Sequence, residues 1–219
     1  MLVHTRNQAM IAVLGGTFDP VHFGHLRVAL EVRERLSCTE VRFVPCSTPP
    51  HRPPPVASVE QRLEMLRLAT LATSEFIVDQ RELGRAGPSY TVDTLASLRD
   101  ECGTMPLVLI IGMDAFAALD TWHEWRRLTE YAHLIVVERP GASCPDAGPI
   151  AAVLRERLTT DPVDLHGAPA GRILLCSTTQ LDISATAIRA MVAADRSPRY
   201  LIPDVVFDYI RKEQLYVKR

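Results

Sequence analysis

The sequence predicts an α/β protein with a doubly wound parallel sheet. Short apolar runs typical of buried strands alternate along the 219 residues with longer segments that carry apolar side chains at helical spacing. A glycine turn, Gly15-Gly16, separates the first apolar run from the first helical segment. Because strands that alternate with helices need crossover connections, we expect these strands to pair in parallel.

The start of the chain predicts a βαβ unit. A strand is expected at 10–14, a helix at 24–36 with arginine and glutamate on its outer face, and a second strand at 41–44. The alternation then continues along the chain. Further helices are expected at 59–73, 90–99, 124–130, 184–194 and 203–214, and further strands at 76–78, 107–111, 133–137 and 172–176.

Two segments interrupt this alternation. Residues 45–55 contain six of the 16 prolines, which predicts a stiff extended loop that is neither a helix nor a central strand. Residues 141–171 are rich in glycine, proline and aspartate. We expect them to form a surface excursion with one helix at 150–158.

Length and charge exclude several classes of protein. The length is enough to bury a core without disulfides, so we expect one domain, 1–219. Within it the alternation of strands and helices predicts a Rossmann-like core at 10–180, with helices on both faces of the sheet, and a small C-terminal helical part at 181–219. The 24 basic and 26 acidic residues give a formal charge of −2, which argues against a nucleic-acid partner held by a broad basic face. No apolar run approaches the roughly 18 residues of a membrane span, and residues 1–9 lack the apolar stretch of a signal peptide. We expect a cytoplasmic protein without a membrane partner, as a monomer or homo-oligomer, whose five cysteines, with no CxxC pair among them, are reduced thiols.

The segment 15–25 (GGTFDPVHFGH) carries most of the chemistry. Its glycines let the backbone come close to a phosphate, and the amides at the start of the following helix point to the edge where the strands end. It is neither a GxGxxG motif nor a P-loop. His22 and His25 are three residues apart, so they share one face once the helix has begun, and imidazoles there can bind phosphate and neutralise charge in phosphoryl or nucleotidyl transfer. There are two alternatives for these histidines. They could be an ordinary polar pair, or they could be part of a metal site whose third ligand the sequence does not identify.

This segment resembles the GGTFDPxHxGH signature of the HxGH nucleotidyltransferase superfamily. Residues 184–189 (SATAIR) resemble its second signature, SxTxIR, and both are expected to open a helix after a strand. Within the superfamily the chain is most similar to the bacterial nicotinate-nucleotide adenylyltransferases. That similarity rests on 49–52 (PPHR), 89–95 (SYTVDTL), 111–114 (IGMD) and 122–125 (WHEW). The resemblance implies transfer of the adenylyl group of ATP to nicotinate mononucleotide, which gives deamido-NAD and pyrophosphate.

The resemblance also implies which residues form the site. Catalytic roles are implied for His22, His25, Arg52 and Arg189. The residues implied to bind ATP are Gly15, Gly16, Thr17, Phe18, His22, His25, Gly112, Asp114, Ser184, Thr186 and Arg189. The residues implied to bind nicotinate mononucleotide are Gly16, Thr17, His51, Arg52, Tyr90, Thr91 and Trp122, the last by stacking on the pyridine ring.

The expected reaction is an in-line attack of the mononucleotide 5′-phosphate on the α-phosphorus of ATP. Because a phosphate monoester is already anionic near neutral pH, the protein needs to supply only positioning and charge stabilisation. His22 and His25 are expected to hold α- and β-phosphate oxygens, Arg52 the triphosphate, and the helix N-terminus at Ser184 with Arg189 the leaving phosphates. Mg²⁺ is expected as the counter-ion of ATP, held by phosphate oxygens and water, with no metal cage made by the protein.

Several of these residues have structural alternatives. Trp122 and Trp125, three residues apart, could both be core anchors of one helix. Tyr90 and Thr91 could be only the start of a helix, with Thr91 or Ser89 as its cap. Asp114 follows a strongly apolar strand at the edge where an α/β sheet opens, and a carboxylate there would be costly unless it bound a ligand such as ribose hydroxyls.

One position departs from the family pattern. Cys46 stands before the PPHR segment, where many members have asparagine, and a thiol cannot replace the paired donor and acceptor of an amide. The fourth position of that segment is Arg52, which is always charged and can form two parallel hydrogen bonds with a phosphate.

Two other functions compete with this interpretation. A sibling adenylyltransferase could act on phosphopantetheine, nicotinamide mononucleotide or FMN, although the SYT and WxxW segments argue against phosphopantetheine. A catalytically silent nucleotide sensor is the second, and the intact His22, His25, Ser184, Thr186 and Arg189 argue against it.

Overall fold

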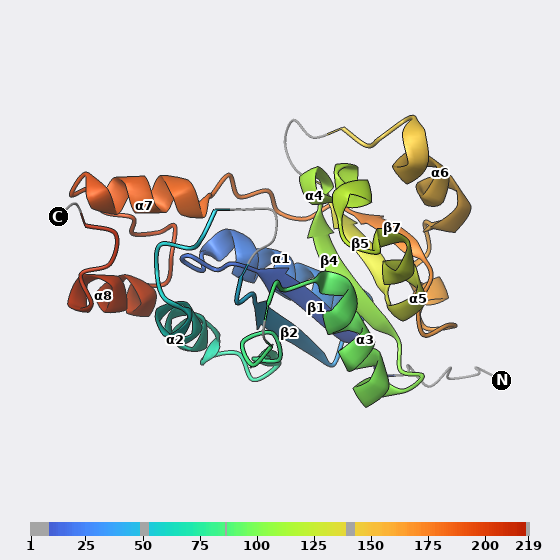
Figure 1. Ribbon diagram of the computed structural model, residues 1–219, viewed down its shortest axis with the longest axis horizontal. Helices are drawn as coiled ribbons and strands as arrows, with labels where there is room; N and C mark the ends of the chain where they lie inside the picture. Colours follow the sequence, from blue (N-terminus) through green and yellow to red (C-terminus); the bar gives the residue numbers. More distant parts are fainter. Residues whose placement is uncertain (1–8, 49–52, 86, 139–142, 218–219) are drawn as a thin grey trace.

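The computed structural model describes residues 9–48, 53–85, 87–138 and 143–217 (Figure 1). The strands in these ranges are β1 (Ile11–Gly16), β2 (Glu40–Pro45), β3 (Phe76–Val78), β4 (Leu107–Gly112), β5 (His133–Val137), β6 (Leu158–Thr159) and β7 (Ile173–Cys176). They form one seven-stranded sheet in the order β3-β2-β1-β4-β5-β7-β6, and every neighbouring pair is parallel. The predicted fold class is confirmed.

Helices connect the strands nearly everywhere. Those in the described ranges are α1 (Phe23–Leu36), α2 (Val59–Thr70), α3 (Thr91–Cys102), α4 (Met113–Ala117), α5 (Leu128–Tyr131), α6 (Gly148–Arg157), α7 (Ala185–Ala193) and α8 (Asp204–Lys212), with 3₁₀ turns η1 (Leu119–Thr121), η2 (Trp125–Arg127) and η3 (Pro162–Leu165). The longest, α1, has 14 residues, and within the described ranges no helix has the length and apolar character to cross a membrane.

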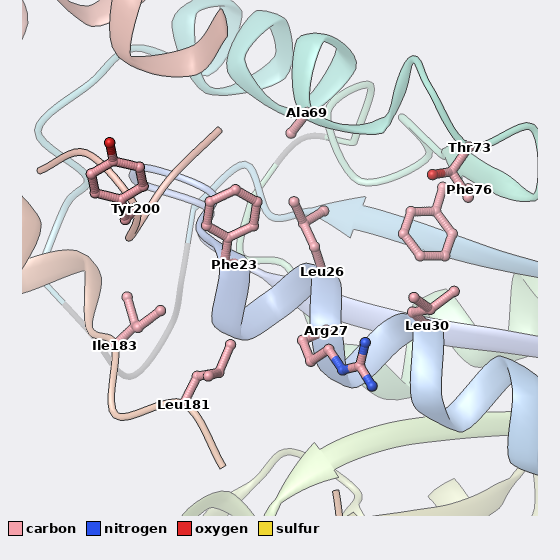
Figure 2. A pocket seen from close by; sticks show the side chains of 10 residues that line it. All are labelled: Phe23, Leu26, Arg27, Leu30, Ala69, Thr73, Phe76, Leu181, Ile183 and Tyr200. Atoms are coloured by element: carbon pink, nitrogen blue, oxygen red, sulfur yellow. The ribbon is translucent and has the colours of Figure 1, made fainter. Parts of the chain in front are cut away.

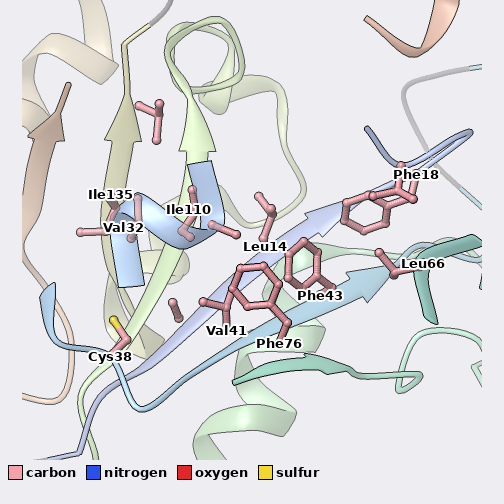
Figure 3. Close-up of a cluster of buried hydrophobic side chains, with 14 of the residues drawn as sticks. Leu14, Phe18, Val32, Cys38, Val41, Phe43, Leu66, Phe76, Ile110 and Ile135 are labelled. Atoms are coloured by element: carbon pink, nitrogen blue, oxygen red, sulfur yellow. The ribbon is translucent and has the colours of Figure 1, made fainter. Parts of the chain in front are cut away.

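The helices cover both faces of the sheet, as predicted. Side chains alternate along each strand, so Ala12 and Leu14 of β1 face one hydrophobic cluster while Ile11 and Val13 face another. Helices α1, α2, α7 and α8 contribute to the first cluster, and α3, α4, α5 and α6 to the second. Figure 3 shows part of the first cluster, in which the rings of Phe43 and Phe76 lie 5.0 Å apart between centroids.

The C-terminal helices pack onto the main body of the molecule. In Figure 1, α7 and α8 lie at one end of the molecule, with α8 next to α2. Ile188 of α7 and Val206 and Ile210 of α8 are buried in the first hydrophobic cluster, together with residues of the sheet. The second signature is therefore carried by a helix that shares a core with the helix of the first.

Capping residues set several helix ends. Ser58 precedes α2, and its hydroxyl accepts a hydrogen bond from the Gln61 amide while the Gln61 side chain accepts one from the Ser58 amide. Ser184 precedes α7 and accepts a hydrogen bond from the Ala187 amide at 3.1 Å.

The single helix predicted at 124–130 is wrong. The segment forms η2 followed by the four-residue α5. Glu124 has a left-handed backbone with φ +47°, which a continuous helix does not allow. Trp125 and Leu128 are both buried in the second cluster, so two short turns in succession reproduce the apolar spacing of one helix.

The surface excursion predicted at 141–171 is also wrong over much of its length. Helix α6 buries Ile150, Ala151 and Leu154 against the second cluster, and Leu165 of η3 is fully buried. Strand β6 pairs with β7 at the edge of the sheet. A two-residue strand is too short to show a period of two in the sequence, which is why it was missed.

Pro45 corrects a further prediction. It is the last residue of β2, an inner strand, where it pairs with Gly16 of β1. Proline has no N–H to donate, but at the strand end the next ladder hydrogen bond comes from the Cys46 amide to the Gly16 carbonyl, at 3.0 Å. Pro49 and Pro50 of the same proline-rich segment lie outside the described residues.

Candidate functional site

The sheet opens between β1 and β4. Strand β1 pairs with β2 over Ile11–Gly16, but with β4 only over its first three residues, Ile11 to Val13. From their carboxyl ends the chain continues into α1 on one face of the sheet and into α4 on the other. Parallel α/β sheets bind their ligands at such a switch point. The predicted site segments that follow Gly16 and Gly112 therefore begin at the same edge.

The loop after β1 is held by one buried aromatic ring. Phe18 has φ +50°, a left-handed conformation that is uncommon for a bulky residue. Its ring is 2% exposed and packs edge-on against His25 at 5.1 Å and against Phe43 at 5.9 Å. A Cβ at Gly16 would lie 3.0 Å from this ring, so glycine is needed to seat it. The Phe18 side chain is thus part of the core, and a contact with ATP would come from its backbone.

The two histidines meet where α1 begins. His22 is the N-cap residue, and His25 lies in the first turn. Their rings stack with centroids 3.7 Å apart and planes at 26°, and the His22 amide donates a hydrogen bond to His25 Nδ1 at 3.3 Å. A Cβ at Gly24 would lie 3.0 Å from the His22 ring, which accounts for the glycine between them. The prediction that both histidines share one face is confirmed, and their catalytic role stays a prediction.

Asp19 is a central residue of the loop that sequence patterns do not reveal. Its side chain is 4% exposed. The carboxylate accepts hydrogen bonds from the Val56 amide at 2.8 Å, the Ala57 amide at 3.2 Å and the Tyr216 hydroxyl at 2.7 Å. In the sequence an Asp-Pro pair indicates only a turn, because these three donors lie far along the chain.

A buried arginine supports the same loop. Arg62 of α2 is 1% exposed, and its guanidinium donates to the Thr17 carbonyl at 2.8 Å and to the Ser47 carbonyl at 3.4 Å. It thereby joins the loop after β1 to the loop after β2. Its charge favours anions at this edge of the sheet. Sequence analysis missed it, because its spacing marks only one more position on an amphipathic helix.

The second signature reaches the first. Arg189 Nη1 donates to the carbonyl of Asp19 at 2.6 Å and lies 3.8 Å from its carboxylate, although the two residues are 170 positions apart. Arg189 Nη2 lies 3.2 Å from the Thr186 hydroxyl and donates to it. The Ser184 hydroxyl caps α7, whose N-terminus therefore keeps its remaining amides for a ligand. The predicted juxtaposition of the two signatures is observed.

The SYT segment lies beside the loop after β2. The Ser89 hydroxyl accepts a hydrogen bond from the Ser47 amide at 3.1 Å, and the Ser89 amide donates to the Thr48 carbonyl at 3.1 Å. Tyr90 occupies the N-cap position of α3, and Thr91 is the first residue of the helix. Tyr90 and Thr91 do begin this helix, but neither Ser89 nor Thr91 is its cap residue.

A buried carboxyl group lies behind this segment. Glu82 is 6% exposed and accepts a hydrogen bond from the Thr94 hydroxyl at 2.6 Å. Burial raises the pKa of Glu82 above its ordinary value, and hydrogen bonds from Thr94 and Ser89 oppose that rise. Arg85 donates to the same Thr94 hydroxyl at 3.0 Å. The hydrogen bonds of Thr94 with Glu82 and Arg85 hold the first turn of α3 in place.

The two tryptophans take different positions. Trp125 is 8% exposed in the second cluster, with the Arg126 guanidinium 4.4 Å from its ring centroid. Trp122 is only partly buried, at the end of η1, and its neighbour His123 contacts the Tyr90 ring at 4.3 Å. The core-anchor alternative is right for Trp125. The pyridine-stacking role of Trp122 stays a prediction, and His123 is an added aromatic group that the sequence analysis missed.

The remaining predicted residues lie at the end of β4 and in the proline-rich segment. Gly112 is the N-cap residue of α4, and Asp114 lies in its first turn. Asp114 is exposed, so the expectation that a carboxylate there would be costly is wrong, because it keeps its hydration. A role in holding ribose stays a prediction. His51 and Arg52 lie outside the described residues.

Cys46 contacts a predicted ligand residue. Its thiol donates a weak hydrogen bond to the Thr17 hydroxyl, with Sγ 3.7 Å from Oγ1. Burial raises the pKa of the Cys46 thiol, so it is protonated near neutral pH and is a donor rather than a nucleophile. The position at which many family members have an amide is thus occupied by a group that bonds the glycine-rich loop itself.

A separate pocket lies on the outer side of α1. Figure 2 shows its lining, in which Phe23, Leu26, Leu181 and Ile183 surround an apolar space and Arg27 is the charged member. None of the predicted site residues is among those that line it. Phosphate recognition needs polar donors, so this pocket is not the candidate site.

Known proteins resemble the chain in sequence and fold. Residues 13–191 match the cytidylyltransferase-like family model. A probable nicotinate-nucleotide adenylyltransferase of Methylococcus capsulatus is 52% identical over 95% of this chain and 100% of that protein, and one of Aeromonas salmonicida is 46% identical over 95% and 98%. A Plasmodium falciparum nicotinic acid mononucleotide adenylyltransferase, solved with NaAD, is 17% identical with a TM-score of 0.74 over 95% of this chain and 97% of that one. This last likeness shows a shared fold.

Proposed function

The chain belongs to the nicotinate-nucleotide adenylyltransferase family, within the cytidylyltransferase-like proteins, and from this membership we propose that it transfers the adenylyl group of ATP to nicotinate mononucleotide, giving deamido-NAD and pyrophosphate. One observation carries this proposal for the chain's own residues. The hydrogen bond from Arg189 to the Asp19 carbonyl holds the two signatures at the same edge of the sheet. A triphosphate bound there would face the amides and imidazoles of one signature and the helix N-terminus of the other.

The groups at this edge suit phosphate. The N-terminus of the 14-residue α1, with its partial positive charge, follows the loop, and His22 and His25 stand at that end. The buried guanidinium of Arg62 adds a positive charge next to Thr17 of the loop after β1. The one buried carboxylate of the loop, that of Asp19, is bound by three hydrogen-bond donors and lies near Arg189, so its charge is balanced locally.

The reaction follows from this placement. A 5′-phosphate oxygen of the mononucleotide forms a bond to the α-phosphorus while the bond to the bridging oxygen of the β-phosphate breaks, and the leaving pyrophosphate takes the electron pair. His22 and His25 hold the α- and β-phosphate oxygens as charge moves toward the leaving group. The N-terminus of α7, with Arg189, then receives the β,γ-phosphates, and Arg52 acts on the triphosphate from the proline-rich segment.

The mononucleotide is proposed to lie over the start of α3. Tyr90 and Thr91 begin that helix, and the Tyr90 ring contacts His123 next to the partly buried Trp122. Aromatic groups at this place offer a stacking surface for a pyridine ring. Ser89 forms hydrogen bonds with Ser47 and Thr48 of the loop after β2. These bonds fix the start of α3 relative to that loop, on the two sides of the proposed pocket.

Mg²⁺ is proposed to enter with ATP. The side chains of the loop fit an ion held by phosphate oxygens and water, because the Asp19 carboxylate already accepts three hydrogen bonds and the other loop groups are histidines and amides. In the described part of the chain no three His, Cys, Asp or Glu side chains are grouped as metal ligands. When bound, Mg²⁺ would neutralise charge on the triphosphate.

Pyrophosphate release tests the proposed function. The purified protein is given ATP with Mg²⁺ and, in separate reactions, nicotinate mononucleotide, nicotinamide mononucleotide, FMN or phosphopantetheine. We expect the highest kcat/KM with nicotinate mononucleotide and a product with the mass of deamido-NAD. A higher kcat/KM with another acceptor would reassign the enzyme to a sibling activity. If none of the four acceptors led to pyrophosphate release, the protein would be a catalytically silent nucleotide sensor.

The cellular setting is proposed on chemical grounds. The five cysteines of the chain are free thiols in the structure, which suits a reducing cytoplasm that also contains ATP. Fractionation of the source cells, with detection of the native protein, tests this location. Light scattering over a range of protein concentrations distinguishes a monomer from a homo-oligomer.

A further inference from the structure

The C-terminal end of the chain reaches the first signature. Helix α8 ends at Lys212, and the Leu215 amide donates to the Ile210 carbonyl at 3.0 Å, which turns the chain back against the helix. Tyr216 follows with φ +64° and directs its hydroxyl to Asp19 Oδ1, 2.7 Å away and 197 positions earlier in the sequence. Leu215, which is 8% exposed, anchors this turn in the first hydrophobic cluster.

The hydroxyl of Tyr216 acts as a hydrogen-bond donor. Burial and the nearby Asp19 carboxylate both raise the pKa of Tyr216, so the phenol keeps its proton. Phenol donation to an ionised carboxylate is charge-assisted and stronger than a neutral hydrogen bond. The only other contact recorded for this hydroxyl among the described residues is with Met65 Sδ, at 4.0 Å, which is a weak acceptor.

Asp19 connects Tyr216 to the candidate site through its other hydrogen bonds. Its Oδ1 binds both Tyr216 and the Ala57 amide, its Oδ2 binds the Val56 amide, and its carbonyl oxygen accepts from Arg189. Three other parts of the chain therefore meet on this residue of the first signature: Val56 and Ala57 just after the proline-rich segment, the second signature, and the C-terminal tail. Asp19 lies between the buried Phe18 and the N-cap residue His22, so its position sets the direction in which the loop enters α1.

We propose that Tyr216 is a positioning residue for adenylyl transfer, which holds the Asp19 carboxylate and through it the loop that carries His22. This rests on the proposed function. Tyr216 is proposed to touch neither the substrates nor the histidines. Its effect passes through Asp19, because without the phenol Oδ1 keeps only the Ala57 amide as a donor, and the carboxylate is held less firmly between that amide, the Val56 amide and Arg189.

The test separates positioning from stability. Tyr216→Phe removes only the hydroxyl, and Tyr209→Phe is the matched control, because Tyr209 lies on α8 and its hydroxyl has no hydrogen bond among the described residues. We expect Tyr216→Phe to lower kcat about tenfold, with KM for ATP and for nicotinate mononucleotide each within about twofold of wild type. Tyr209→Phe should leave all three constants unchanged.

A double-variant cycle shows whether the effect passes through Asp19. The kcat values of Asp19→Asn, Tyr216→Phe and the combined variant are compared with wild type. We expect the combined variant to match Asp19→Asn within about twofold, because residues that act through one contact are not additive. Losses in kcat that simply multiply, or a Tyr216→Phe variant with a lower Tm and an unchanged kcat, would overturn the proposal.

Hydrogen exchange gives a readout that needs no catalysis. In ligand-free protein the amides of Val56 and Ala57, which donate to Asp19, should exchange faster in Tyr216→Phe than in wild type and in Tyr209→Phe. Unchanged exchange at these two amides would also overturn the proposal. If wild-type protein released no pyrophosphate with any acceptor, the proposed function would fail, and this exchange measurement would still decide whether Tyr216 holds the loop.

Discussion

At the first turn of α1 the His25 imidazole contacts both Phe18 and His22. Its ring stacks on that of His22, and its Nδ1 accepts a hydrogen bond from the His22 amide at 3.3 Å. Because Nδ1 is an acceptor, the proton of the neutral ring is on Nε2. That nitrogen is the one that would donate to a phosphate oxygen, so the cap of the helix also selects the useful tautomer.

The first prediction concerns this imidazole. His25→Ala should lower kcat by about 10² to 10³, because a hydrogen bond that strengthens as charge develops is lost. Loss of the cap acceptor should cost only about 1 kcal/mol of unfolding free energy, so the variant should stay folded. Steady-state kinetics and thermal unfolding check both effects, with His166→Ala as a control outside the site. A kcat close to wild type would remove His25 from the proposed mechanism.

Gly15 provides a second test at the residue scale. A Cβ at Gly15 would meet no atom within 4 Å, whereas one at Gly24 would lie 3.0 Å from the His22 ring. Gly15→Ala should therefore leave Tm unchanged and raise KM for ATP at least about tenfold, because the methyl group occupies space that a phosphate needs. Gly24→Ala should instead lower Tm and kcat together. If Gly15→Ala bound ATP normally, close approach of the nucleotide to this turn would be contradicted.

At the scale of helices and strands, the sequence predicted what has a long, regular pattern. Strand 133–137 and the helices around Leu66 and Leu95 were found, because several turns or a full run of apolar residues show one period. The segment after Trp122 was not found, because the left-handed Glu124 breaks it and glutamate gives no sign of that conformation. The pattern predicted that His22 and His25 share one face, which is observed, but it did not single out Asp19 or Arg62, because their partners lie in other elements.

The two tryptophans give an element-scale prediction. Trp122→Ala should raise KM for nicotinate mononucleotide far more than KM for ATP, because its partly buried ring lies beside the Tyr90 and His123 pair. Trp125→Ala should lower stability by about 3 to 5 kcal/mol, because it opens a cavity in the second cluster. Kinetics of the first variant and urea unfolding of the second measure these effects. A larger rise in KM for ATP than for the mononucleotide would overturn the pocket assignment.

The start of β5 gives a pH-dependent prediction. His133 is fully buried, its Nδ1 accepts from the Arg172 amide at 3.0 Å and its Nε2 donates to the Ala168 carbonyl at 2.9 Å, which describes a neutral ring. Burial lowers the pKa of His133 below its ordinary 6.5. Below that pH the unfolded chain binds a proton that the folded chain refuses, so the stability is present above 6.5 and lost as pH falls toward the folded pKa.

Unfolding by urea at several pH values checks this linkage. Between about pH 6.5 and the folded pKa, wild type should lose stability with falling pH more steeply than His133→Gln, by up to about 1.4 kcal/mol per pH unit. The variant has lower stability at neutral pH, so the comparison uses the slopes rather than the values. Equal slopes would show that His133 binds its proton equally well in the folded and the unfolded protein, which would contradict the lowered pKa.

At the scale of the whole molecule, a nearly neutral chain is proposed to hold two strongly anionic substrates. The formal charge of −2 argues against a broad basic face, and the structure places several positive groups at one edge of the sheet. Arg62, Arg189 and the N-termini of α1 and α7 gather at the edge where β1 and β4 separate, while the acidic Asp19 is enclosed by its donors. The position of these few positive groups, rather than the net charge of the protein, is proposed to attract the anionic substrates.

Transfer of labelled phosphorus tests the central claim most directly. The protein is incubated with Mg²⁺, nicotinate mononucleotide and ATP labelled with ³²P at either the α- or the γ-phosphate, and the products are separated. Adenylyl transfer predicts that α-label appears in deamido-NAD while γ-label appears only in pyrophosphate, in equal molar amounts. Transfer of γ-label to the mononucleotide, or retention of both labels in ATP, would contradict it.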